Sequence, residues 1–327
     1  MGGTTNPQSG GERDSAGGAY SVAILGAGRV ASAFASALAT TPDDNAGPAK
    51  RRLRWIGCWA RREVQALSAC GRALRFEELA TADIVLLAVS DVAIATLAKR
   101  LSSLDLKGVK VVAHVSGAHD CSVLAALEGR GPALARMHPL ASVPAVAGSA
   151  EFLVDAPCVL SGDPAAKVPL TALANSLGMR PTWVGSLDSS LYHAAAALAS
   201  NGVTALVDVA ARMFAAASDD RLGLDVARSL ASSACQGLAR ATPEAALTGP
   251  VRRGEFAVVR RHLDALRGSS FEPLYVAVMT AALEVAIRGG LENAAAARIR
   301  TLLAGEVRDD DSDNDSDSVG DSDGAAR

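Results

Sequence analysis

The sequence predicts an α/β domain with a doubly wound, mainly parallel sheet, followed by an all-α domain. Two features of the chain carry this prediction. Up to residue 185, short runs rich in Val and Ile alternate with helical stretches, which is the order of strand–helix–strand units. Beyond Gly185 the chain is rich in Ala and Leu, with polar residues at helical intervals. A length of 327 residues agrees with two domains.

Continuous apolar runs predict the strands, because a strand buried on both faces has no polar side. Four such runs are each followed by a helical stretch: 20–26 by 29–39, 53–59 by 63–69, 82–89 by 91–101, and 109–117 by 121–129. Further short strands are expected at 133–137, 158–160 and 181–184. These segments predict that the α/β domain spans residues 20–185.

The second domain is expected at 186–305, with helices at 189–217, 225–239, 256–266 and 273–288. Asp188 or Ser189 could cap the first helix, and Pro243 and Gly249-Pro250 interrupt the series. The Gly/Ser-rich leader at 1–19 and the Asp-rich tail at 306–327 cannot bury apolar surface, so both are expected to be disordered.

The net charge of −3 is unevenly distributed. Residues 309–327 hold eight Asp and one Arg, a sum of −7, which leaves +4 for the rest of the chain. A mildly basic body suits an anionic cofactor or substrate. With only six Phe, three Trp and three Tyr, and no basic stripe, nucleic-acid binding is not expected. The tail could attract a basic partner, or it could serve solubility alone.

No apolar run reaches the roughly 18 residues of a membrane span, and the first residues lack the order of a signal peptide. We therefore expect no membrane association and a cytoplasmic location. The five cysteines form no Cys-x-x-Cys pair and do not cluster with His. This pattern predicts neither a disulfide framework nor a metal site, in keeping with a reducing compartment.

A glycine-rich turn predicts a dinucleotide site. Gly26-Ala27-Gly28-Arg29-Val30-Ala31 follows an apolar strand and opens a helix. Gly26 permits the tight turn, Gly28 lets the backbone approach a pyrophosphate, and Ala31 allows close helix–strand packing. The helix start offers free N–H groups and a positive dipole. The competing interpretation is a fold that keeps the turn without the ligand.

The end of the second strand predicts the choice of cofactor. An NAD site carries an acid there, whereas this chain has Arg61 and Arg62 and no acid before Glu63. A guanidinium suits a 2′-phosphate, so NADPH is expected, with Arg29 over the pyrophosphate. Alternatively, these arginines are a solvated helix start. Ligands of open α/β sheets bind beyond the carboxyl ends of the strands, which places Val89 and Ser90 beside the ribose and Ser116 and Gly117 beside the nicotinamide.

Two isolated polar residues predict the reacting end of the site. His193 and Asn201 stand among small apolar residues of one predicted helix, on a face expected to be buried or to line a cleft. Hydride addition to a carbonyl needs a proton donor, a role that suits His193. Otherwise, His193 bonds a backbone carbonyl. His114 is equally open between a core histidine and a catalytic one. Thr248 and Arg252 or Arg253, beside a Thr-Gly-Pro turn, could bind a carboxylate or be a solvated cap.

Five motifs carry a family resemblance: GAGRVA, HVSGA, RMHPL, LYHAAAALASN and ALTGPVRRGE. The chain resembles Rossmann-like oxidoreductases with a C-terminal helical domain of unknown function, related to ketopantoate reductase, pyrroline-5-carboxylate reductase and the 6-phosphogluconate dehydrogenase group. The resemblance implies a homodimer built through the helical domain. His138, in the RMHPL motif, is expected among the substrate residues, and which of His114, His138 and His193 face the cleft stays open. In ketopantoate reductases a Lys stands where this chain has His193, and no Lys follows Lys167.

These observations predict an NADPH-dependent oxidoreductase that reduces a small carboxylated carbonyl compound. A 2-oxo acid of the ketopantoate type is the first expectation for the substrate. His193 would supply the proton and Asn201 would orient the nicotinamide or the substrate. One alternative is an imine reductase of the pyrroline-5-carboxylate type. Another is an NADP-binding sensor or scaffold without turnover.

Overall fold

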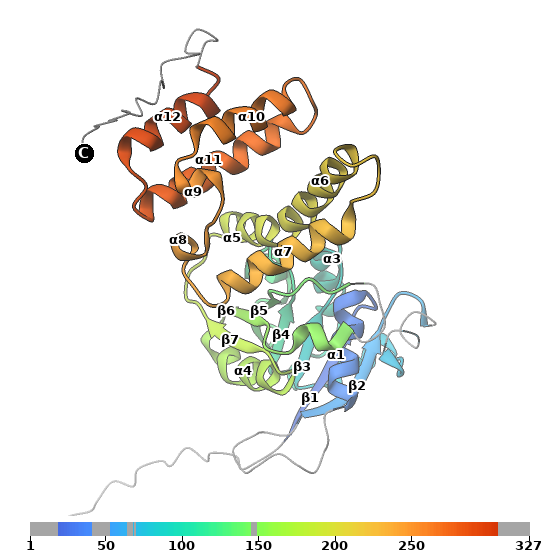
Figure 1. Ribbon diagram of the computed structural model, residues 1–327. Helices are drawn as coiled ribbons and strands as arrows, with labels where there is room; N and C mark the ends of the chain where they lie inside the picture. Colours follow the sequence, from blue (N-terminus) through green and yellow to red (C-terminus); the bar gives the residue numbers. More distant parts are fainter. Residues whose placement is uncertain (1–18, 41–52, 64–67, 69, 145–148, 307–327) are drawn as a thin grey trace, which may run out of the picture. The chain divides into compact units, whose positions relative to one another are not determined.

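The computed structural model describes residues 19–40, 53–63, 68, 70–144 and 149–306 (Figure 1). Apart from Ala19 and Glu306, the expected leader and acidic tail lie outside these residues, as does most of the expected helix at 63–69. The chain divides into two compact units, Met1–Ser200 and Asn201–Arg327. We expected the helical domain to begin at 186. The segment 186–200 instead groups with the first unit.

The first unit is built on a seven-stranded sheet. Its strands are β1 (Tyr20–Leu25), β2 (Leu53–Trp59), β3 (Ile84–Leu87), β4 (Val111–His114), β5 (Ala133–Pro139), β6 (Pro157–Gly162) and β7 (Arg180–Trp183). The order across the sheet is β2-β1-β3-β4-β5-β6-β7. Neighbouring strands are parallel except β5 and β6, which are antiparallel. The expected mainly parallel sheet is confirmed.

Helices cover both faces of this sheet, so the fold is doubly wound. Val22 and Ile24 of β1 share one buried cluster with Phe34 of α1 (Arg29–Thr40) and with α4 (Lys167–Ser176). Ala23 and Leu25 point the other way and join a cluster with Ile94 of α3 (Asp91–Leu101). The chain goes from β1 to β2 on one side and returns to β3 on the other. The carboxyl end of β1 is therefore the switch point at which such sheets bind ligands.

Two short segments depart from the expected helices. The stretch expected as a helix at 121–129 is a 3₁₀-helix, η2 (Cys121–Leu127), and its first turn is capped by Asp120, whose carboxylate accepts from Ser122 N–H. Helix α4 was not predicted. Its sequence, KVPLTALANS, contains a proline and lacks strong amphipathic spacing, yet Leu170, Leu173 and Ala174 are fully buried.

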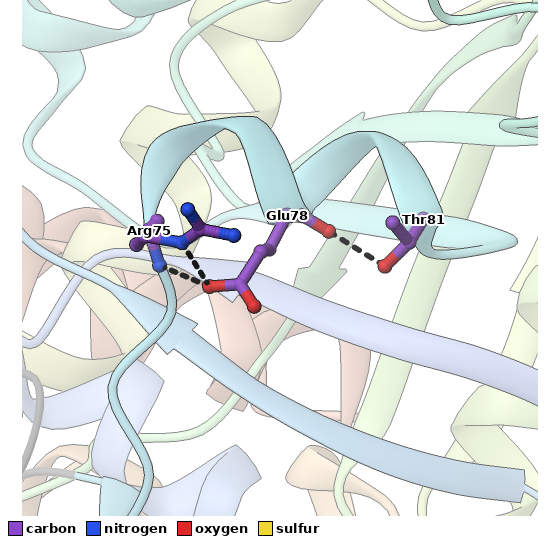
Figure 2. Close-up of polar contacts among 3 residues, drawn as sticks. All are labelled: Arg75, Glu78 and Thr81. Carbon is purple, nitrogen blue, oxygen red and sulfur yellow. Dashed lines mark hydrogen bonds and ion pairs between the residues drawn. The ribbon is translucent and has the colours of Figure 1, made fainter.

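A capped 3₁₀-helix, η1 (Phe76–Thr81), follows the second strand region. Figure 2 shows the cap: the Glu78 carboxylate accepts from Arg75 N–H at 2.7 Å, and the Arg75 guanidinium lies 3.4 Å away. Thr81 Oγ1 donates to the Glu78 carbonyl at 2.8 Å. The backbone hydrogen bond from Arg75 is the main cause that lowers the pKa of Glu78. This cap fixes the start of η1, where Phe76 enters the core.

A disulfide joins Cys58, in β2, to Cys70. The expectation that the cysteines stay unpaired was therefore wrong. The two residues are 12 apart with no Cys-x-x-Cys spacing, and only the folded chain brings them together. Cys121, Cys158 and Cys235 are free. Because a disulfide is present, the cysteine pattern no longer supports a reducing compartment.

The second unit is helical, as expected. It contains α6 (Val203–Ala216), α7 (Leu224–Leu238), α8 (Pro243–Ala246), α9 (Pro250–Arg253), α10 (Phe256–Leu266), α11 (Glu272–Arg288) and α12 (Asn293–Leu303). Helices α6 and α7 pack on each other, whereas α9 to α12 surround a small core of Val251, Val259, Leu283 and Ile299. Helix α12 was not predicted. The Thr-Gly-Pro turn ends in Gly249, whose φ of 93° leads into α9.

One continuous helix, Ser189–Ala216, combines α5 (Ser189–Ala197), a π-helical turn η5 (Leu198–Gly202) and α6. Asp188 caps it, accepting from the N–H groups of Ser190 and Leu191 at 3.0 Å. By length and composition alone it could cross a membrane, and none of its apolar window is buried. The expectation that this face is buried is therefore wrong, whereas the alternative that it lines a cleft holds for His193, which lines a cavity of the first unit. The π turn also changes the regular α-helical spacing expected between His193 and Asn201.

Candidate functional site

A cavity of ≈ 1110 Å³ lies in the first unit, beyond the carboxyl ends of β1 to β4. It brings together most of the residues expected to bind the cofactor or act on the substrate: Gly26, Gly28, Arg29, Val30, Arg61, Val89, Ser90, Ser116, Gly117, His138 and His193. They come from loops after the strands, from the start of α1 for Arg29 and Val30, from β5 for His138 and from α5 for His193. Its volume is that of a site for a large ligand, because pockets for drug-sized molecules hold about 300–1,000 Å³.

The glycine turn forms one wall of the cavity. Gly26 has a φ of 138°, its N–H donates to the Trp59 carbonyl at 2.8 Å, and a Cβ there would collide with the Ala88 carbonyl oxygen. A Cβ on Gly28 would instead meet nothing within 4 Å. Ala31 is fully buried, where α1 packs on the sheet. The turn thus leaves open space over Gly28 at a helix N-terminus, the arrangement that a pyrophosphate needs.

The end of the cavity after β2 carries cations and aromatic rings. Arg61 lines the cavity, whereas Arg62 is exposed and is not among its lining residues. Sequence reasoning missed Arg100 of α3, which also lines the cavity. Its guanidinium lies 3.9 Å from the Phe76 ring and 4.9 Å from the Trp59 ring. Those two rings pack edge to face at 5.1 Å. Arg100 lies in the last turn of α3, where basic residues are common in any helix, so nothing in the sequence singles it out.

The opposite end holds two histidines that converge on Gly117. A Cβ on Gly117 would lie 2.8 Å from His138 Nε2 and 2.9 Å from His193 Nδ1, so a larger residue there would push the two rings away. The two ring nitrogens are therefore at most 5.7 Å apart (2.8 plus 2.9). On its other side, His138 Nδ1 lies 2.6 Å from the Tyr192 hydroxyl. Sequence reasoning did not single out Tyr192, although it stands next to His193.

His114 was open between a core role and a catalytic role, and the structure shows a core histidine. It is fully buried, its Nδ1 accepts from Ser116 N–H at 3.2 Å, and its Nε2 lies 3.2 Å from the Asp120 carbonyl. Burial, with a smaller effect of the Arg136 charge, lowers the pKa of His114 to about 4. His114 therefore holds the loop that carries Ser116 and Gly117, and it is not among the residues that line the cavity.

The remaining expected site residues belong to the second unit. Asn201 is exposed in the π turn. Arg252 donates to the Gly289 carbonyl at 3.0 Å, at the end of α11, and Arg253 pairs with Glu255 at 2.7 Å. Thr248 precedes the Gly249 turn. None of them is among the lining residues of the cavity in the first unit.

The fold is a Rossmann-type domain, and its cavity lies at the edge of the sheet where such domains bind ligands. The family models agree: residues 4–139 match the Rossmann-like domain and residues 156–283 match the domain of unknown function DUF2520. The chain thus joins a Rossmann-like domain to a DUF2520 domain, and the DUF2520 match also takes in β6, α4 and β7 of the first unit. The family expected from the sequence motifs is confirmed. No curated protein matches the sequence.

Several solved structures share the fold. Protein TM1727 from Thermotoga maritima is 23% identical with a TM-score of 0.62, over 82% of this chain and 98% of that one. BF3122 from Bacteroides fragilis, provisionally named an NADP oxidoreductase, is 21% identical with a TM-score of 0.60, over 81% and 98%. A Plasmodium falciparum pyrroline carboxylate reductase with NADP bound is 14% identical with a TM-score of 0.50, over 83% and 98%. At these identities the likeness establishes the fold alone.

Proposed function

We propose that this protein is an NADPH-dependent reductase of a small carboxylated compound with a C=O or C=N bond. The observation that carries the proposal is the single cavity of the first unit, which joins a dinucleotide-type glycine turn at one wall to two convergent histidine nitrogens. The combination of a nucleotide cradle and proton-carrying groups is that of a hydride-transfer enzyme.

The cavity residues fit a nicotinamide dinucleotide. Gly28 and the start of α1 leave room for its pyrophosphate, with Arg29 beside it. Arg61 and Arg100 offer cations for a 2′-phosphate, which supports NADPH over NADH. Val89 and Ser90 would flank the ribose, and Ser116 and Gly117 would flank the nicotinamide. When bound, the nicotinamide supplies a hydride.

His138 and His193 are the residues that can deliver the matching proton. Both line the cavity and both direct a ring nitrogen toward Gly117. Reduction of a carbonyl builds negative charge on oxygen, and a positioned donor is expected to accelerate that step about 10²- to 10⁴-fold. His193 was the expected donor, and His138 joins it on the same wall. The expected roles of Asn201 on the nicotinamide or substrate, and of Thr248 and Arg252 on a substrate carboxylate, remain proposals for the second unit.

Two substrate classes compete. A 2-oxo acid, such as ketopantoate, needs a protein donor for its carbonyl oxygen, which suits the histidine pair. A cyclic imine of the pyrroline-5-carboxylate type arrives already protonated and depends less on that pair. The fold shared with a pyrroline carboxylate reductase favours keeping the imine as the second candidate. Removal of both imidazoles, as His138→Asn with His193→Asn, should lower oxo-acid turnover far more than imine turnover.

The first experiment is a parallel fluorescence titration of the purified protein with NADPH and NADH. Micromolar NADPH binding and much weaker NADH binding are expected, followed by NADPH oxidation in the presence of ketopantoate, other 2-oxo acids or pyrroline-5-carboxylate. Binding without oxidation of NADPH by any of these would favour the sensor or scaffold. Failure to bind either nucleotide would overturn the proposed function.

We also propose that the protein is a homodimer built through the helical unit. The family resemblance carries this expectation, and exposed apolar side chains support it. On α6 and α7 these are Val203, Leu206, Leu224, Val226, Leu230 and Leu238. Contiguous exposed apolar surface of this kind marks interaction sites in soluble proteins.

A further inference from the structure

Arg136 of β5 is a buried cation without an acidic partner. Its side chain is 1% exposed, and no carboxylate lies within ion-pair distance of it in the part of the chain that the structure describes. One terminal nitrogen donates to the His119 carbonyl at 3.3 Å and to Ser189 Oγ at 3.1 Å. Its Nε is buried with no hydrogen-bond partner among the described residues. Asp120 interacts with this charge only from beyond ion-pair distance. A buried charge without a direct acidic partner is unfavourable, so this guanidinium calls for a functional explanation.

A chain of contacts leads from Arg136 to the cavity. The guanidinium carbon lies 5.3 Å from the centre of the Tyr192 ring. The Tyr192 hydroxyl lies 2.6 Å from His138 Nδ1, and the two rings meet edge to face at 5.5 Å. The opposite nitrogen, His138 Nε2, reaches the cavity beside Gly117. Arg136 also donates a hydrogen bond to Ser189, which lies one turn before Tyr192 in α5. This bond holds α5 against β5 and so keeps Tyr192 between Arg136 and His138.

The protonation states of this chain follow from burial and charge. Burial, then the charges of Arg136 and His193, lower the pKa of His138 to about 4, against a smaller raising effect of Asp91. Burial raises the pKa of Tyr192 to about 12, although Arg136 acts in the opposite direction. At neutral pH the pair is therefore a neutral imidazole and a phenol. The phenol can donate to Nδ1, which leaves the imidazole proton on Nε2, on the cavity side.

We propose that Tyr192 is the proton source of the reaction, acting through His138, and that Arg136 stabilises the tyrosinate that remains. This inference rests on the proposed function and assigns its proton path. As hydride adds to the substrate carbon, the C=O π pair moves to oxygen. That oxygen takes the proton from His138 Nε2, and Nδ1 of the same ring takes the proton from Tyr192. His138 ends neutral, as its other tautomer, and water later returns a proton to Tyr192.

This proton relay, from Tyr192 through His138 to the substrate oxygen, assigns different roles to the two cavity histidines. His138 touches the substrate and is the catalytic residue, whereas Tyr192 and Arg136 act through it and are positioning residues. His193 has no hydrogen-bond partner among the described residues and is left to orient the substrate from the other side of Gly117. A neutral His138 alone could form a hydrogen bond to an alkoxide. Backed by Tyr192, it can give its proton away without becoming an imidazolide.

The test compares Tyr192→Phe with a matched control, Tyr275→Phe. Tyr275 makes the same kind of bond, 2.7 Å from His262 Nδ1 with the rings edge to face at 5.9 Å, but it lies in the second unit and does not line the cavity. Turnover of the best oxo-acid substrate should fall about 100-fold or more in Tyr192→Phe, with NADPH affinity unchanged. Tyr275→Phe should match the wild type. Arg136→Met should lose turnover, and Arg136→Lys should recover part of it.

Two readouts separate a relay from a structural role. The first is the turnover rate in mixtures of H₂O and D₂O, plotted against the fraction of deuterium. For the wild type this plot should be curved, because two protons move in the step. For Tyr192→Phe it should be a straight line, because only one proton moves. Nitrogen-15 NMR of the histidines in the full chain should show His138 protonated on Nε2 at neutral pH. Turnover of Tyr192→Phe within twofold of the wild type, a straight line in the wild type, or a His138 protonated on Nδ1 would each overturn the relay. A wild type that binds NADPH and turns over no substrate would instead overturn the proposed function, and the NMR result would still decide the hydrogen-bond order.

Discussion

At the scale of single residues, the two neighbouring arginines after β2 are expected to contribute differently to NADPH binding. Arg61 lines the cavity and Arg62 does not. Arg61→Ala should weaken NADPH binding about 10- to 100-fold, from roughly 1.5–3 kcal/mol for a hydrogen bond between charged groups. NADH binding should change little, because NADH has no 2′-phosphate. Arg62→Ala is the matched control. Parallel titrations of each variant with NADPH and NADH test this prediction. An equal loss of affinity for both nucleotides in Arg61→Ala would refute the claim that Arg61 selects NADPH over NADH.

Buried histidines also predict how stability depends on pH. The pKa values of His114 and His138 are lowered to about 4 from an ordinary 6.5, chiefly by burial. Between these values the unfolded chain binds protons that the native chain does not. The free energy of unfolding should therefore fall as the pH drops from about 6.5 toward 4, by at most about 3 kcal/mol for each histidine.

The variant that tests this dependence is His114→Asn. An amide can still accept from Ser116 N–H but does not titrate in this range. Urea unfolding at several pH values should show a shallower fall in the variant than in the wild type. The same slope in both proteins would mean that His114 does not contribute to the acid sensitivity.

At the scale of elements, the glycine turn between β1 and α1 combines two separate requirements. Gly26 needs a positive φ and has no space for a Cβ, whereas Gly28 is open on the cavity side. Gly26→Ala should destabilise the fold by at least about 2 kcal/mol. Gly28→Ala should keep the thermal midpoint of the wild type and lose NADPH affinity. Undiminished NADPH binding by Gly28→Ala would contradict the assignment of this wall to the pyrophosphate.

The disulfide is expected to stabilise the segment that follows β2 and to support NADPH binding there. Cys58 directly precedes Trp59 and Arg61 of the cavity wall, and its bond to Cys70 closes a loop of 12 residues. Loss of such a cross-link costs about 3 kcal/mol in the chain-entropy model. Cys70→Ala, or treatment with a dithiol, should therefore lower the free energy of unfolding by that amount and weaken NADPH binding. Cys235→Ala removes an exposed free thiol and should change neither quantity.

At the scale of the whole molecule, patterns along the chain predicted what depends on neighbours in sequence. The strand 20–25 is apolar from Val22 to Leu25 because both its faces are buried, and α10 was expected at its observed bounds, 256–266, because its apolar residues keep helical spacing. Contacts between distant residues could not be predicted in this way. The bond between His138 and Tyr192 spans 54 residues, and the packing of Arg100 on Trp59 needs β2 and α3 to be adjacent. No local pattern encodes either contact, so the sequence predicted which residues line the cavity at strand ends and in motifs, and it did not predict which side chains pair there.

The state of association is the last property that belongs to the whole molecule. Val226 and Leu230 lie four residues apart on α7, so they share one side of that helix, and Leu230 is 63% exposed. We expect a second copy of the chain to cover this side, and sedimentation should give twice the chain mass of 33.2 kDa. Leu230→Glu should shift the protein toward a single chain mass, because a carboxylate would be buried in the interface. Ser232→Glu adds the same charge two residues further on, where the side chain faces another way, and should leave the dimer intact. A single chain mass for the wild type would contradict the dimer, and a wild type that sediments with lipid vesicles would assign the apolar helices to a membrane surface instead.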